Sequence, residues 1–266
     1  MTFPRKTIAS PVRFEGLGLH TGVPVIMMVH PSEHGIRFRI GQDIVKASPE
    51  NVTDTTRCTR LGPVGTVEHL MSALAGLEIT DAEVELNAAE VPGMDGSSGI
   101  FFDTLHAAGT AEIGEAVLPH LYRRVFFKEG DTEIAVGKGT GHWRYAFDTG
   151  ARWPGRQVVE TVSVMEDYPV SISRARTFAF AEEIPMIIQL GLGKGLDESS
   201  ALILGIEGYK NEARFEDEPA RHKLLDIIGD LYLAGIPIRF LNVSSDRSGH
   251  TANVKTAALL KQSAEP

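Results

Sequence analysis

The sequence predicts an α+β fold of two similar two-layer domains, each a sheet covered by helices, with the functional site at their interface. Alternating apolar patterns typical of strands and longer periods typical of helices succeed one another in the same order in each half. Aligning His69 with His222 also aligns Gly76 with Gly229, which indicates an internal duplication. A chain of 266 residues can bury two small cores. We therefore expect domains at 1–112 and 118–266, related by a pseudo-twofold axis.

The first half begins with paired strands at 7–30, whose glycines mark turns or close backbone approach. A helix is expected up to Gly76, with Thr66 as its N-cap residue. The other elements expected in this half are short strands within 31–52, a strand at 56–61, an alternating strand at 82–87, a loop at 90–99 and a helix at 100–109.

Residues 111–122 are interpreted as the linker between the halves. The elements expected after it are strands at 122–127, 132–136, 142–147 and 158–164, a loop at 148–156, helices at 180–190 and 199–204, a helix from Pro219 through Tyr232, a strand at 236–242 and a helix at 252–260. Each half therefore has a central helix followed by a strand and a second helix.

Net charge and cysteine content limit the classes of function that the protein can have. The net charge of −9 argues against nucleic-acid binding, which needs a basic face. The single cysteine, Cys58, excludes an intrachain disulfide and fits a reducing compartment. No stretch approaches the apolar length of a membrane span, and the N-terminus lacks the apolar run of a signal peptide. We expect a cytoplasmic, monomeric protein.

One helix in the second half carries an unusual polar stripe. His222, Asp226 and Asp230 recur every fourth residue, so their side chains line one face of an otherwise apolar, buried helix. An imidazole and a carboxylate at this spacing can bind one metal ion, although a hydrogen-bonded pair is the simpler alternative. The duplication brings His69 to the same interface and supplies a third ligand. Three protein ligands with an open position are typical of catalytic zinc.

Two further residues are candidates for proton transfer. Glu68 directly precedes His69 and could take a proton from water, or it could be an ordinary surface glutamate. His250 lies in a loop and could protonate a departing amine when Asp230 orients it, or it could be an exposed loop histidine.

Together these residues resemble the zinc-dependent UDP-3-O-acyl-N-acetylglucosamine deacetylases of lipid A synthesis, the LpxC family. The resemblance covers about residues 6 to 262. The matching segments are Phe14–Gly22, Thr66–Leu70, Met94–Ser97, Ser173–Phe178, Arg221–Asp226 with Gly229–Leu231, and Ser248–His250 with Asn253.

The resemblance implies a role for each candidate. It implies Zn²⁺ on His69, His222 and Asp226, with Glu68 as general base and His250 as general acid supported by Asp230. It further implies that Thr177 holds the reacting carbonyl, that Lys223 and Phe178 line the substrate site, and that His20 and Cys58 lie near the metal. The family's passage for an acyl chain corresponds here to about 148–172, which is shorter than usual.

Three functions remain open. The first is deacetylation of the acylated UDP-amino sugar, a small-molecule substrate whose diphosphate Lys223, Arg174, Arg176 and Lys194 could attract. Arg174 and Arg176 could equally be solvated surface charges. The second is a related zinc deacetylase for another N-acetyl sugar without a long acyl chain, favoured by a closed or polar cleft beside 148–172. The third is a catalytically silent protein that binds nucleotide sugars.

Overall fold

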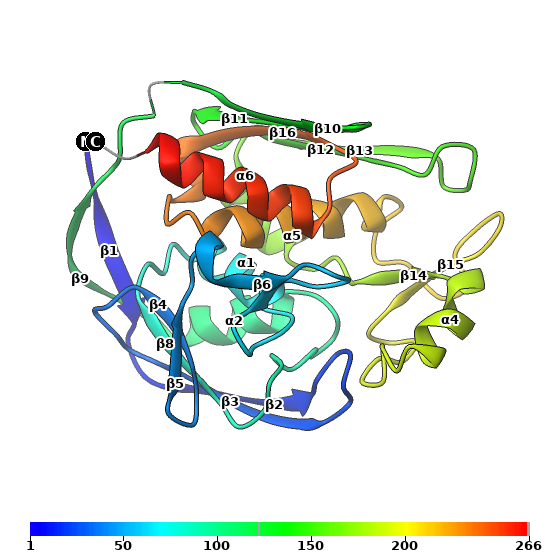
Figure 1. The fold of residues 1–266 in the computed structure, drawn as a ribbon, viewed down its shortest axis with the longest axis horizontal. Helices are drawn as coiled ribbons and strands as arrows, with labels where there is room; N and C mark the ends of the chain where they lie inside the picture. Colours follow the sequence, from blue (N-terminus) through cyan, green and yellow to red (C-terminus); the bar gives the residue numbers. More distant parts are fainter. Residues whose placement is uncertain (122, 265–266) are drawn as a thin grey trace.

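The structure, a computed structural model, describes residues 1–121 and 123–264. Two five-stranded sheets form its outer layers, and the longer helices lie between them (Figure 1). The first sheet has the order β2-β3-β8-β4-β5, and its strands are β2 (Val12–Leu17), β3 (Pro24–His30), β8 (Ala82–Leu86), β4 (Ile36–Ile40) and β5 (Asp43–Lys46). The second has the order β10-β11-β16-β12-β13, and its strands are β10 (Val125–Glu129), β11 (Thr132–Lys138), β16 (Leu241–Asp246), β12 (Trp143–Asp148) and β13 (Arg156–Thr161).

The two sheets have the same topology. In each one the last strand in sequence, β8 or β16, inserts between the second and third, pairing antiparallel with one and parallel with the other. A helix precedes this strand and another follows it: α1 (Glu68–Gly76) and α2 (Gly99–Ala108) in the first half, α5 (Glu218–Tyr232) and α6 (His250–Ser263) in the second. The expected fold of two similar halves is therefore confirmed.

The central helices α1 and α5 pack against each other between the sheets (Figure 1). Every residue of α1 is buried, and so are nearly all residues of α5. The end of α1 also packs closely against Tyr168, since a Cβ on Gly76 would stand 2.4 Å from the ring of that residue. Apolar side chains from both sheets and both helices form one continuous core. This packing brings polar residues of two sequence halves to one point.

Several expected elements were wrong. Residues 111–117, placed in the linker, belong to β9 (Thr110–Val117), which pairs antiparallel with β1 (Thr2–Ile8). Residues 199–204, expected as helix, contain β15 (Leu202–Leu204), which pairs with β14 (Phe178–Phe180). Short apolar runs of this kind do not distinguish strand from helix by periodicity. The division into domains at 1–112 and 118–266 stays a prediction.

Other elements begin or end a few residues away from their expected bounds. The strand expected at 122–127 is β10, while residue 122 itself lies outside the described residues. Thr66 does not cap α1, since its hydroxyl donates to Glu90 instead. The remaining short elements are β6 (Val52–Asp54), β7 (Arg60–Leu61), α3 (Val164–Asp167), α4 (Ile184–Gln189), and the single turns η1 (Pro49–Asn51), η2 (Tyr168–Ile172), η3 (Ala181–Glu183) and η4 (Ile238–Phe240). Among the described residues, no helix is long and apolar enough to cross a lipid bilayer.

Candidate active site

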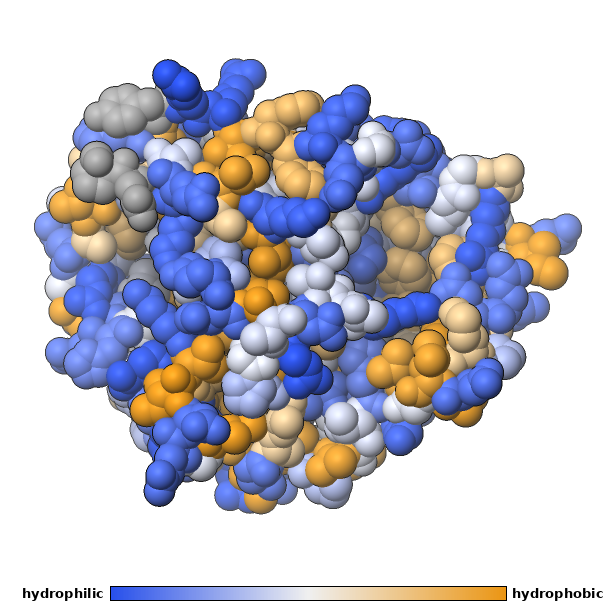
Figure 2. Space-filling model, viewed as in Figure 1, coloured by the Kyte–Doolittle hydropathy of each residue, from blue (hydrophilic) through white to orange (hydrophobic). Residues whose placement is uncertain are grey.

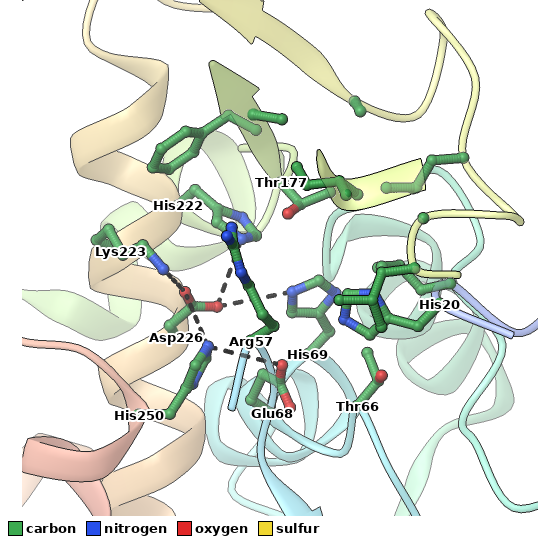
Figure 3. Close-up of a pocket in the computed structure, with 18 of the residues that line it drawn as sticks. His20, Arg57, Thr66, Glu68, His69, Thr177, His222, Lys223, Asp226 and His250 are labelled. Atoms are coloured by element: carbon green, nitrogen blue, oxygen red, sulfur yellow. Dashed lines mark hydrogen bonds and ion pairs between the residues drawn. The ribbon is translucent and has the colours of Figure 1, made fainter. Parts of the chain in front are cut away.

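Two imidazoles and one carboxylate converge where α1 meets α5 (Figure 3). Asp226 Oδ1 lies 3.6 Å from Nε2 of His69 and 3.5 Å from Nε2 of His222. All three side chains are buried, and their donor atoms lie within 4.8 Å of one another. His69 comes from the first half of the chain and the other two come from the second. The sequence-predicted metal ligands are thus brought together.

These residues fit a divalent metal ion. Asp226 Oδ1 is buried and has no hydrogen-bond partner among the described residues, although it faces both imidazoles. Such an orphaned buried carboxylate oxygen is costly unless a cation satisfies it. Ligand atoms of one tetrahedral zinc ion stand roughly 3.4 Å apart, which matches the two distances from Asp226. Two nitrogens and one oxygen are also a donor set that zinc accepts.

Neighbouring groups prepare the ligands for a metal. The ring of His222 donates through Nδ1 to the carbonyl oxygen of Ala175 at 3.1 Å, which leaves the Nε2 lone pair facing the site. Burial lowers the pKa of His222 to about 3, so this ring is neutral. Burial alone raises the pKa of Asp226, but the ammonium group of Lys223, 2.8 Å from Oδ2, and the positive charge of His250 hold it well below its usual range. A neutral imidazole and an ionised carboxylate are the forms that bind metals.

Glu68 is the first residue of α1 and is buried beside the three donor atoms. Its Oε2 accepts a hydrogen bond from the backbone N–H of Thr59 at 2.9 Å, and its Oε1 lies 3.9 Å from Nε2 of His250. Burial raises the pKa of Glu68, which makes its carboxylate a stronger base than an exposed one. Its position beside the donor atoms suits a group that takes a proton from water there.

His250 is the first residue of α6 and faces the same point from the other side (Figure 3). Its Nδ1 donates to Oδ2 of Asp230 at 3.0 Å, since an ionised carboxylate can only accept. Burial alone lowers the pKa of His250, but the charge and hydrogen bond of Asp230, together with the charge of Glu68, raise it to about 9. The imidazole is therefore protonated at neutral pH and can donate from Nε2.

A cavity of about 320 Å³ opens from this cluster. Its polar lining includes Glu68, the three donor residues and His250. Its apolar lining includes Leu19, Ala179, Ile187, Leu192, Leu196 and Ala201. Exposed apolar side chains continue along α4 at Met186, Ile188 and Leu190, where Figure 2 shows hydrophobic atoms gathered over the region of this helix. The cavity thus joins a charged centre to an apolar wall.

The other predicted site residues fall in different places. Thr177, Phe178, Lys223 and His20 line the cavity, and Thr177 points into it beside His222 (Figure 3). The Lys223 ammonium lies 5.6 Å from the centre of the Phe178 ring. Asp230 lies behind His250, fully buried. Cys58 is also buried but does not line the cavity, and burial raises the pKa of its thiol to about 12.

Two expectations about substrate contacts were wrong. The apolar wall was expected from 148–172, but among the described residues none of that stretch lines the cavity, and most of the wall comes from 178–201. Those residues form a separate unit of β14, α4 and β15 beside the site (Figure 1). Neither Arg174 nor Arg176 lines the cavity. Arg176 is buried against Glu218, whereas Arg174 is a partly exposed surface charge that pairs with Asp103.

Sequence reasoning missed two residues in the loop before β7. Thr59 is fully buried and bonds to both Glu68 and Asp230. Arg57 lines the cavity and lies 3.5 Å from Glu183 across its rim. The backbone φ of Arg57 is +66°, a conformation that residues other than glycine seldom adopt, so the surrounding structure must stabilise it. No periodicity or motif marks these positions, since their partners are distant in sequence.

Comparisons with known proteins show which family the sequence matches. The family model described as "UDP-3-O-acyl N-acetylglycosamine deacetylase" (LpxC) matches residues 5–262. A protein of Cellvibrio japonicus named UDP-3-O-acyl-N-acetylglucosamine deacetylase is 35% identical, over 96% of this chain and 89% of its own length. Proteins with the same name from Xanthomonas campestris pv. campestris and Teredinibacter turnerae are 38% and 37% identical, over 96% and 94% of this chain and 89% and 87% of their own lengths.

Proposed function

The chain belongs to the LpxC family, and on this premise we propose that it removes the N-acetyl group from UDP-3-O-acyl-N-acetylglucosamine in lipid A biosynthesis. The cavity is the observation that supports this substrate, because apolar residues line the same cavity as the cluster of His69, His222 and Asp226. An acyl chain needs such a wall, whereas a sugar without one does not. The proposed cofactor is Zn²⁺, held by these three residues.

Bound zinc would polarise the acetamide carbonyl and acidify a water molecule next to it. Residues of the chain transfer the protons and stabilise the developing charge. Glu68 accepts a proton from water as the water oxygen bonds to the acetyl carbon. Thr177 points into the cavity and can donate its hydroxyl hydrogen to the carbonyl oxygen, on which negative charge develops.

His250 completes the reaction by giving its Nε2 proton to the nitrogen of the leaving amine as the carbon–nitrogen bond breaks. The products are acetate and the free amino sugar. Asp230 holds the imidazole through Nδ1 and compensates its positive charge. The raised pKa of His250 supports this role, because an amine leaves poorly unless it is protonated.

The remaining cavity residues are proposed to bind substrate. Phe178 offers an aromatic face beside His222, and the two ring centres lie 6.1 Å apart. Lys223 forms an ion pair with Asp226 and lines the cavity, where it can attract the anionic diphosphate. His20 has a buried Nδ1 without a partner among the described residues, so a substrate hydroxyl is a suitable ligand for it. For Cys58 the buried position supports a packing role beside Glu68.

Acetate release from the acylated and the non-acylated UDP-N-acetylglucosamine, measured side by side with the zinc-loaded chain, tests the proposal. We expect efficient release from the acylated substrate only, and none after Glu68→Ala. Release from the non-acylated sugar alone would favour a different substrate. Binding of either sugar without release by wild type or variant would make the chain a silent binding protein.

A further inference from the structure

Thr59 lies between the two groups that transfer protons in the proposed function. It stands in the loop before β7 and its exposed fraction is 0%. Its backbone N–H donates to Oε2 of Glu68 at 2.9 Å. Its hydroxyl lies 2.6 Å from Oδ1 of Asp230, which belongs to the other half of the chain. One residue therefore contacts the base and the carboxylate that orients the acid.

The direction of the hydroxyl bond follows from chemistry. An ionised carboxylate can only accept, so the single hydroxyl hydrogen of Thr59 points to Asp230. The second contact of this hydroxyl, 3.3 Å from Nδ1 of His250, is longer, and that nitrogen already donates to Asp230. The bond from Thr59 to the carboxylate is short and charge-assisted, the stronger kind of hydrogen bond.

The carboxylate of Asp230 is held at both oxygens. Oδ2 accepts from His250 and from the side-chain amide of Asn253 at 2.9 Å, whereas Oδ1 accepts from the hydroxyl of Thr59. Without the hydroxyl, Oδ1 would be a buried acceptor with no donor at that position. The carboxylate would then turn toward other donors and take the imidazole of His250 with it.

The backbone of Thr59 is also fixed. Its carbonyl oxygen accepts a hydrogen bond from the N–H of Val67 at 3.2 Å, directly before α1 begins. The loop is thus tied to the start of the helix that carries Glu68 and His69. A residue held in this way cannot move without moving the base.

We propose that Thr59 is a positioning residue that sets the general base Glu68 and the general acid His250 relative to each other across the interface of the two halves. Its backbone holds the base, and its hydroxyl holds Asp230 and through it the acid. This inference rests on the proposed deacetylase function. It assigns Thr59 no contact with substrate or metal.

The test compares Thr59→Val, which removes the hydroxyl at nearly constant volume, with Thr59→Ser, which keeps it. We expect Thr59→Val to lower kcat about ten- to a hundredfold, the usual range for lost outer-shell partners, with KM within about twofold and zinc still bound. Thr59→Ser restores kcat to near the wild-type value. The matched control is Thr256→Val, which removes another fully buried hydroxyl, one that donates to the carbonyl oxygen of Ala252 within α6.

A double variant separates positioning from general damage. If Thr59 acts through Asp230, then Thr59→Val lowers kcat little further in an Asp230→Asn background. The inference would be overturned if the fold-losses in kcat of Thr59→Val and Asp230→Asn multiplied fully in the double variant. It would also be overturned if Thr59→Val had the same kcat as Thr256→Val. Wild type without deacetylase activity would instead overturn the proposed function.

A second measurement needs no turnover. In NMR spectra of the chain labelled at its histidine nitrogens, the Nδ1 proton of His250 should be protected from exchange by Asp230 in wild type, Thr59→Ser and Thr256→Val. We expect this signal to broaden or disappear in Thr59→Val. An unchanged signal would refute the positioning role whatever the enzyme acts on.

Discussion

Gly229 in α5 lies so close to Glu68 in α1 that a Cβ at position 229 would stand 2.1 Å from the carbonyl oxygen of Glu68. No side chain fits at this crossing. The contact is three residues beyond Asp226 along α5 and one residue before His69 along α1, so it fixes the distance between helices that supply the donor atoms. Because Gly229 has no side chain, the two helices can approach closely enough to bring their donor atoms together.

Replacing Gly229 by alanine should separate the two helices. Overpacking of this kind costs about 1–3 kcal/mol, and we expect a lower unfolding temperature together with weaker zinc binding. Calorimetry and a zinc titration of the variant measure both. Gly208→Ala is the control, because a Cβ there meets no atom within 4 Å. Zinc affinity equal to wild type in Gly229→Ala would show that the crossing does not set the site.

Zinc should stabilise the folded chain through His222. A ligand that binds only the native state adds about 2.7 kcal/mol to the free energy of unfolding at a hundred times its Kd. We expect zinc to raise the unfolding temperature of wild type, a chelator to reverse the rise, and His222→Ala to remove it. His142→Ala, which alters a partly exposed histidine paired with Glu160, should keep the full response. An undiminished response in His222→Ala would exclude this histidine as a ligand.

Glu68→Gln should abolish most turnover while leaving metal and substrate binding intact. The amide keeps the size of the side chain and can still accept the bond from Thr59, but it takes no proton from water. Loss of a general base lowers rates by about 10² to 10⁴. Steady-state kinetics and metal analysis check this, with Glu160→Gln on the exposed surface as control. Activity within a few-fold of wild type would remove Glu68 from the mechanism.

The alkaline side of the pH profile should depend on Asp230. The pKa of His250 is raised to about 9, so the acid stays protonated below that pH and activity falls as pH rises through it. Asp230→Asn removes the negative charge that raises this pKa and leaves burial, which lowers it. The alkaline limb of kcat/KM should therefore move to lower pH, by about one unit or more. A limb that stays in place would mean that another group titrates there.

The sequence alone predicted the parts of the site that follow local rules. His222 and Asp226 are one helical turn apart, so periodicity places them on one face. His69 followed from the duplication, and both sheets indeed share one topology. These features depend on spacing along the chain, which a sequence displays directly.

What the sequence did not predict depends on contacts between distant segments. Thr59 and Asp230 are 171 residues apart, and no pattern links them. The resemblance placed the apolar wall in 148–172, whereas residues within 178–201 line the cavity. A short run such as 202–204 reads as helix or strand until its partner strand is known. None of the residues of β9 is buried, so its sequence resembles a linker, and only its pairing with β1 identifies it as a strand.

The most direct test of the central claim is a titration of zinc into the metal-free chain while acetate release from UDP-3-O-acyl-N-acetylglucosamine is followed. Activity should be absent at the start, rise in proportion to added zinc, and reach its plateau at one equivalent per chain, since His69, His222 and Asp226 form a single site. Full activity in the metal-free chain, or none at any zinc concentration, would contradict it.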